Sequence, residues 1–157
     1  MATKITIEQI EAIQQIWGDR LVKVGAFFSK DKDYKAEAEK LVDELYGYNE
    51  GTVLFKPTKA AEKQFRLTAE GAVSYFVGAN ENYPEDKGFA LNPWKSVRFE
   101  NAGFILEADY AIAMGNYIFT DMQDKETKVE YTFGYFHSVE GVLKINVHHS
   151  SLPFITN

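Results

Sequence analysis

The chain has no cysteine among its 157 residues. It therefore offers no disulfide framework, no thiolate nucleophile and no cysteine ligand for a metal ion. Basic residues are also scarce, because 17 Lys and Arg stand against 23 Asp and Glu, for a net charge of −6. Without a basic stripe this balance argues against a nucleic acid partner, since phosphate backbones are bound by clustered Lys and Arg.

Long apolar runs are absent too. No stretch approaches the roughly 20 residues that cross a bilayer. The N-terminal segment carries Glu8 and Glu11 inside its apolar pattern, which is not typical of a signal peptide. We therefore expect a cytoplasmic protein without a membrane partner.

Aromatic residues are plentiful, with 12 Phe, 9 Tyr and 2 Trp making up 15% of the chain. Such rings serve a large core and an apolar pocket equally well. A chain of this length is most simply one domain, residues 1–157, that buries roughly two-thirds of its unfolded surface. Neither internal repeats nor linkers interrupt it.

The first part of the chain has helical periodicity. Thr6 and Gln9 have capping-box spacing, and apolar residues then recur every three or four positions up to the Ser29–Asp33 cluster. Two further helices are predicted over Tyr34–Leu45 and Ala69–Phe76. We also expect short strands over 52–56 and 64–67, and a lid or packed loop over 79–93.

From Lys95 onward the period changes to two. Alternation predicts strands over 96–106, 110–121, 127–136 and 143–152. Helices followed by a four-stranded antiparallel meander indicate an α+β fold.

The register of the last predicted hairpin follows from its apolar face. Pairing Tyr135 with Ile145 and Phe133 with Val147 leaves a three-residue loop that ends at Gly141, where a positive φ is needed. The same register, extended, turns His149 and Ser151 toward the helices, and their neighbours His148 and Ser150 outward. An inward His and Ser are either satisfied core residues or pocket residues, and both readings stay open.

The three histidines do not predict a metal site. His148 and His149 are adjacent on a strand and leave opposite faces, whereas His137 lies roughly 30 Å away along the hairpin. A site of His149 with carboxylates stays open, although no acidic pair is spaced to demand one. We therefore expect no metal and no cofactor, and chemistry that comes from hydroxyls, imidazole and backbone.

Several segments resemble the iota-class carbonic anhydrases. They cover most of the chain from Trp17 onward, with the Phe-Lys-Pro-Thr and His-His-Ser-Ser motifs as their more specific parts: Tyr48–Thr58, Pro84–Trp94, Ala113–Tyr117, Val129–Phe136 and His148–Pro153. This class belongs to the nuclear-transport-factor-2-like superfamily, relatives of the association domain of calmodulin-dependent kinase II. The resemblance implies a cone, in which a strongly bent antiparallel sheet wraps three N-terminal helices around a pocket.

The resemblance also implies an activity, the interconversion of CO2 and bicarbonate without a metal. Carried over by position, the hydroxyls that hold water and bicarbonate are those of Thr58, Tyr75 and Ser151, with Ser150 as the competitor of Ser151. We expect His149 to accept or relay the proton. Candidate apolar walls for CO2 are Phe55, Phe76 and Tyr131.

Other readings accompany each of these residues. Thr58 is also a plausible helix N-cap, Tyr75 a core residue and Ser151 a strand end. For the whole chain, the competing class is a non-enzymatic dimer that binds a ligand or assembles partners. We expect a homodimer formed through the outer sheet face, with Met114, Asn116, Thr132 and His148 as contributors. A third reading, an isomerase or dehydratase, needs an Asp–His dyad that the sequence does not place.

Overall fold

The computed structural model describes residues 3–156. Its helices are α1 (Ile7–Ser29), α2 (Tyr34–Leu45) and α3 (Ala69–Val77). The predicted capping box is confirmed, because Gln9 N donates to Thr6 Oγ1 at 3.1 Å and Thr6 N donates to Gln9 Oε1 at 2.8 Å. Thr68 caps α3 in the same way, accepting from Gly71 N at 3.1 Å. Local polar side chains thus define the starts of these helices.

Five strands form one sheet in the order β1-β5-β4-β3-β2. Their bounds are β1 (Leu54–Lys56), β2 (Trp94–Leu106), β3 (Tyr110–Asp121), β4 (Glu126–His137) and β5 (Leu143–Ser151). The predicted antiparallel meander is confirmed for β2 to β5, but β1 pairs with β5 in parallel, so the sheet is mixed. The α+β layout is confirmed.

Two short segments differ from the prediction. Residues 64–67 form no strand, although Arg66 N donates to Phe55 O at 2.7 Å beside β1. Inside the 79–93 loop, the 3₁₀ turn η1 (Phe89–Leu91) packs against α1 and α3. A single backbone bond is too little to align a strand, and side chains hold the 64–67 segment instead.

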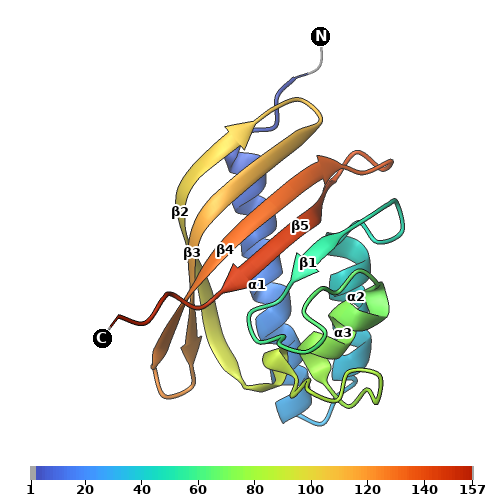
Figure 1. The fold of residues 1–157 in the computed structure, drawn as a ribbon, viewed down its shortest axis with the longest axis vertical. Coiled ribbons are helices and arrows are strands. Elements are labelled where there is room, and N and C mark those ends of the chain that lie inside the picture. The colour runs from blue at the N-terminus through green and yellow to red at the C-terminus, as the bar shows by residue number, and fades with distance from the viewer. Residues whose placement is uncertain (1–2, 157) are drawn as a thin grey trace.

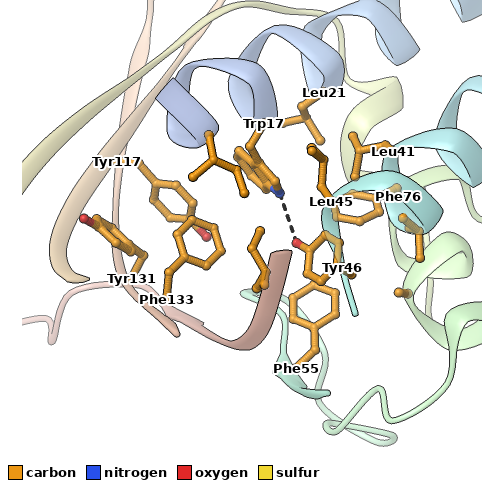
Figure 2. Close-up of a cluster of buried hydrophobic side chains, with 14 of the residues drawn as sticks. Trp17, Leu21, Leu41, Leu45, Tyr46, Phe55, Phe76, Tyr117, Tyr131 and Phe133 are labelled. Atoms are coloured by element: carbon orange, nitrogen blue, oxygen red, sulfur yellow. Dashed lines mark hydrogen bonds between the residues drawn. The ribbon is translucent and has the colours of Figure 1, made fainter. Parts of the chain in front are cut away.

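The sheet curves across one side of α1, while α2 and α3 close the end beside β1 (Figure 1). Trp17 of α1 lies at the centre of the resulting core and is 1% exposed. Its indole stacks on Tyr117 at 5.6 Å and meets Phe133 edge-on at 5.9 Å (Figure 2). The many aromatic residues therefore pack the space between α1 and the bent sheet.

The last hairpin contains a bulge that the sequence analysis did not anticipate. Tyr135 does pair with Ile145, and Gly141 has φ +82° in the turn. The next partner of β4, Gly134, pairs with Val147, so Asn146 is an extra residue on β5. An extra residue reverses the alternation beyond it.

Consequently, the predicted facing of the last motif is wrong. Phe133 pairs with His148 and Tyr131 pairs with Ser150, instead of Val147 and His149. The side chains of His148 and Ser150 are 2% and 1% exposed, and they point into the core.

Within residues 3–156, none of the helices has the length and apolarity needed to cross a bilayer.

Candidate active site

Three hydroxyl groups from two strands and a loop meet where β1 ends beside β5. Ser150 Oγ lies between the other two, 2.6 Å from Thr58 Oγ1 and 2.5 Å from the Tyr117 hydroxyl oxygen. Thr58 follows β1, Ser150 is on β5 and Tyr117 is on β3. Ser150 and Tyr117 are buried, whereas Thr58 is half-buried and is the member nearest to solvent. We call these three residues the hydroxyl cluster.

His148 extends the hydroxyl cluster into the core. Its Nε2 lies 3.0 Å from the Tyr117 hydroxyl, and its Nδ1 lies 2.8 Å from the Tyr46 hydroxyl. The ring stacks on Phe55 with 4.6 Å between centroids. Burial among aromatic rings lowers the pKa of His148 well below its ordinary value, because a charged imidazolium would lose its hydration there. The ring is therefore neutral at physiological pH.

Tyr75 of α3 brings a fourth hydroxyl to the same place. Its oxygen accepts a hydrogen bond from Lys59 N at 3.2 Å, directly after Thr58 in the chain. Burial raises the pKa of Tyr75 above its ordinary value, and burial does the same to the pKa of Tyr117. Both phenols stay protonated and remain hydrogen-bond donors.

A lysine lies beside these hydroxyls. Lys56 Nζ donates to the backbone oxygen of Ser150 at 3.1 Å and approaches that of Thr58 at 3.5 Å. It thereby ties β5 to the loop that follows β1. Partial burial lowers the pKa of Lys56 from its ordinary value. When protonated, its ammonium group places a positive charge beside Thr58 and Ser150.

The loop after β1 is held in place by a buried ion pair. Arg66 has no exposed surface and makes two 2.7 Å hydrogen bonds to the carboxylate of Asp86. The neighbouring Glu85 accepts from the backbone N–H groups of residues 61–63 at 2.8–3.2 Å. Residues 79–93, predicted as a lid or packed loop, thus fasten the segment between β1 and α3.

Two predicted catalytic residues lie outside this arrangement. His149 is exposed on the outer face of the sheet, and Ser151 is half-buried there with its Oγ donating to Glu130 at 2.9 Å. Both were chosen because an unbroken alternation turned them inward. The bulge at Asn146 turns His148 and Ser150 inward instead, so the predicted facing of His149 and Ser151 is wrong.

Some of the remaining predicted residues lie at the hydroxyl cluster, and others lie further from it. Thr58 and Tyr75 lie together at the hydroxyl cluster, and Phe55 contacts both His148 and Tyr75, with 6.2 Å between its centroid and that of Tyr75. Phe76 lies one layer further, stacked on Phe55 at 6.1 Å. Within the described residues no helix begins directly after Thr58, since the next one, α3, starts at Ala69, so the N-cap reading is wrong. Their roles in catalysis stay predictions.

Tyr131 lies opposite Ser150 on the neighbouring strand β4, but its hydroxyl takes part in another set of hydrogen bonds. Its hydroxyl accepts from Gln14 Nε2 at 3.1 Å and donates to Asn101 Oδ1. The ring lies 5.3 Å from that of Tyr117 and does not contact Thr58 or Ser150 through any hydrogen bond of the described residues. The role of Tyr131 as an apolar wall stays a prediction.

Sequence reasoning missed four members of the site: Trp17, Tyr46, Tyr117 and His148. One signal was available for His148, because Gly134 lies inside the predicted strand opposite the last one, and a glycine inside a strand often marks a bulge. A Cβ on Gly134 would lie 2.9 Å from Val147 Cβ, so this glycine makes room for the bulged strand. No comparable signal marks Trp17 or Tyr46.

Among residues 3–156, no three His, Asp or Glu side chains gather closely enough to hold a metal ion. His148 and His149 do leave opposite faces of β5, as predicted. The hydrogen-bond partners of His148 are tyrosines rather than a carboxylate, so the Asp–His dyad that an isomerase or dehydratase would need is not formed by this residue.

Comparison with known proteins gives a consistent result. The family model of metal-independent carbonic anhydrases matches residues 8–152. A metal-independent carbonic anhydrase from Nostoc sp. strain PCC 7120 is 45% identical over 153 residues, which cover 96% of this chain and 75% of that protein.

Solved structures agree with the sequence match. The iota-carbonic anhydrase from a cyanobacterium, crystallised with bicarbonate, has a TM-score of 0.95 and 42% identity, covering 99% of this chain and 97% of that one. A protein from Xanthomonas campestris described as a calcium/calmodulin-dependent protein kinase II association domain has a TM-score of 0.61 and 25% identity, covering 94% and 87% of the two chains. The nuclear-transport-factor-2-like fold is thereby confirmed.

Proposed function

Because this chain belongs to the family of metal-independent carbonic anhydrases, we propose that it interconverts CO2 and bicarbonate at the hydroxyl cluster. The observation that carries the proposal is the 2.6 Å pair of Thr58 and Ser150 hydroxyls, with Tyr75 beside it, at the end of the cluster where Thr58 is half-buried. Neutral donors at fixed positions are the groups that a metal-free site has for binding bicarbonate oxygens.

The chemistry sets what these groups must do. In hydration, a water oxygen forms a bond to the carbon of CO2, the π electrons of one C=O bond move onto its oxygen, which becomes negatively charged, and the attacking water gives up a proton. Zinc-dependent carbonic anhydrases lower the pKa of that water from 15.7 to about 7. Here the hydroxyl donors stabilise the negative charge that develops on the CO2 oxygens, and the proton leaves to solvent on the Thr58 side. Because the proposed mechanism does not lower the pKa of the attacking water as zinc does, we expect modest rates.

Each neighbouring group has a supporting part in this proposal. The Phe55 ring supplies an apolar wall for CO2 next to the donors. Lys56 supplies a positive charge for bicarbonate, whose binding is otherwise disfavoured by the net charge of −6. His149 has no part in it, since it lies on the outer face.

The test is stopped-flow CO2 hydration by the purified full-length chain with a chelator present. We expect activity to persist after chelation. Ser150→Ala and Thr58→Ala should each lower kcat by roughly 100-fold or more, as loss of an oxyanion donor does in other enzymes. Ser151→Ala is the matched control, because Ser151 is the adjacent serine on the opposite face, and it should behave like the unmodified chain.

Three results would contradict the proposal. Activity that disappears on chelation and returns with zinc would exclude the metal-free form. Full activity in Ser150→Ala, or loss in Ser151→Ala alone, would exclude the assigned cluster. A folded chain without any hydration activity would favour the non-enzymatic binding module.

We propose further that the protein is a cytoplasmic homodimer that pairs through the outer face of the sheet. Met114 on β3 is 57% exposed there, and Thr132 and His149 lie on the adjoining strands. His149 takes the place that the sequence analysis gave to His148. Sedimentation of the full chain tests the pairing. A monomer mass at micromolar concentration would contradict it.

A further inference from the structure

A row of buried hydrogen bonds runs from α1 to the hydroxyl cluster. Its members, in order, are Trp17, Tyr46, His148, Tyr117, Ser150 and Thr58. Successive polar atoms lie 2.5–3.0 Å apart. All members before Thr58 are at most 2% exposed. Because water does not reach these groups, their donors and acceptors have to be matched within the row.

The first two members decide the direction of the row. An indole N–H only donates, so the Tyr46 hydroxyl accepts from Trp17, whose nitrogen points at it in Figure 2. The hydrogen of Tyr46 then has His148 Nδ1, at 2.8 Å, as its acceptor among the described residues. If Nδ1 carried the hydrogen instead, the buried Tyr46 hydroxyl would be left with a donor and no acceptor, which is costly.

The remaining directions follow in sequence. A neutral imidazole that accepts at Nδ1 carries its hydrogen on Nε2, so His148 donates to the Tyr117 hydroxyl. Tyr117 then donates to Ser150, and Ser150 donates to Thr58. The hydroxyl hydrogen of Thr58 is the one left for a ligand.

We propose that Trp17 and Tyr46 are positioning residues, which hold His148 as its Nε2–H tautomer and thereby point the hydroxyl hydrogens of the row toward Thr58. The effect on catalysis rests on the proposed function, whereas the tautomer does not. With the opposite tautomer, Tyr117 would donate to His148, Ser150 to Tyr117, and Thr58 to Ser150. A bicarbonate oxygen would then meet a lone pair on Thr58 instead of a hydrogen.

In this arrangement His148 does not act as the base. Its Nδ1 lone pair is occupied by the Tyr46 hydrogen and its Nε2 already carries a hydrogen. It contributes by orienting Tyr117 and, through it, the two hydroxyls that touch the ligand.

Nitrogen-15 NMR of the histidine rings tests the tautomer directly, because the full chain has only three histidines. We expect the resonances of His148, assigned with His137→Gln and His149→Gln variants, to show Nε2–H alone at neutral pH. In Tyr46→Phe the constraint is gone, so the Nδ1–H form should appear. The kcat of the Tyr46→Phe protein for CO2 hydration should fall by about tenfold or more, with little change in KM, as expected when a catalytic array loses its correct tautomer.

Tyr135→Phe is the matched control. It removes a hydroxyl from an equally buried tyrosine whose partner is Gln14, outside the row. The tautomer and kcat should both be unchanged. If Tyr46→Phe does not fold, Trp17→Phe is the second variant: without the indole N–H the Tyr46 hydroxyl can turn its hydrogen away from His148, so a share of the Nδ1–H form should appear.

An Nδ1–H ring or an imidazolium in the unmodified chain at neutral pH would overturn the proposal. A Tyr46→Phe protein whose His148 stays entirely in the Nε2–H form would also overturn the proposal, because Tyr46 would then not set the tautomer. Any loss of kcat in that variant would come from packing. If the unmodified chain hydrates no CO2, the proposed function fails while the NMR result still decides the tautomer.

Discussion

Two buried polar networks lie on the inner face of α1, and they differ in how they end. The row from Trp17 to Thr58 ends in hydroxyls at a half-open edge of the core. The second network, which we call the amide network, consists of Gln14, Asn101, Tyr131 and Tyr135. Both are set among the same aromatic rings of α1 and the sheet.

The amide network closes on itself. Gln14 Nε2 donates to Asn101 Oδ1 at 2.9 Å, and Asn101 Nδ2 donates back to Gln14 Oε1 at 2.9 Å. The Tyr131 hydroxyl fills a further position on Asn101. A bulge in β2 between Asn101 and Gly103 adjoins this pairing. The closed amide network fastens α1 to the sheet, whereas the open-ended row leaves a donor for a ligand. We therefore expect the amide network to contribute mainly to stability and the row mainly to function.

Gln14→Leu should show the largest effect on stability. This substitution removes both hydrogen bonds between the side-chain amides of Gln14 and Asn101 and leaves the buried side of Asn101 without a partner. We expect it to lower the free energy of unfolding by about 1–3 kcal/mol. The kcat of the folded protein should not change. Urea denaturation and stopped-flow hydration measure the two quantities, and Gln15→Leu on the exposed face of α1 is the control.

A loss of kcat in Gln14→Leu at unchanged stability would break the distinction between the two networks.

The open-ended row should make stability depend on pH through His148. Its folded-state pKa is depressed, so below pH 6.5 the unfolded chain binds a proton that the folded chain does not. Stability should therefore fall as the pH drops below 6.5, by at most about 1.4 kcal/mol per pH unit. The aromatic groups around the ring are neutral at these pH values: Trp17, Tyr46, Phe55, Tyr117 and Phe133.

Urea denaturation between pH 5 and 7 measures this slope. His148→Gln should flatten it, and His149→Gln, the neighbour on the outer face, should not. An equal slope in His148→Gln would mean that His148 binds a proton as readily in the folded chain as in the unfolded one.

We expect the smallest effect on stability and on kcat from substitution of Glu85, which accepts hydrogen bonds from the loop that carries Thr58. Backbone N–H groups of Lys63 and Ala61 lower the pKa of this carboxyl, so its contribution is present above the ordinary pKa and is lost as the pH falls through the lowered value. Glu85→Gln should cost under about 1 kcal/mol and lower kcat a few-fold by loosening the loop that carries Thr58. Amide hydrogen exchange of residues 61–63 should quicken.

The exposed Glu62→Gln is the control for Glu85→Gln. Unchanged exchange at residues 61–63 in Glu85→Gln would show that the ion pair of Arg66 and Asp86 holds this loop alone.

Much of the fold was predictable because it depends on local signals. The capping residues Thr6 and Thr68, the helical period of α1 and the two-residue period of β2 to β5 act over a few positions, and all appear in the structure. The parallel pairing of β1 was not predictable in this way. It joins Phe55 to His148 across 93 positions of sequence, and no local pattern records it.

The site was predicted only in part for the same reason. Thr58 and Tyr75 were found through the motif resemblance, and the structure brings them together. His149 and Ser151 were chosen by counting alternation through β5, a count that fails at one extra residue. The members of the row that come from α1 and the end of α2 carry no motif.

From the sequence alone, the residue types of the last strand, its length and its turn at Gly141 were determined, because periodicity and turn chemistry are local. The tertiary structure decided which half of His148–Ser151 faces inward. The physical reason is the contact between neighbouring strands, where Gly134 leaves space for Val147 and lets β5 take in Asn146. That single residue places His148 and Ser150 next to Tyr117.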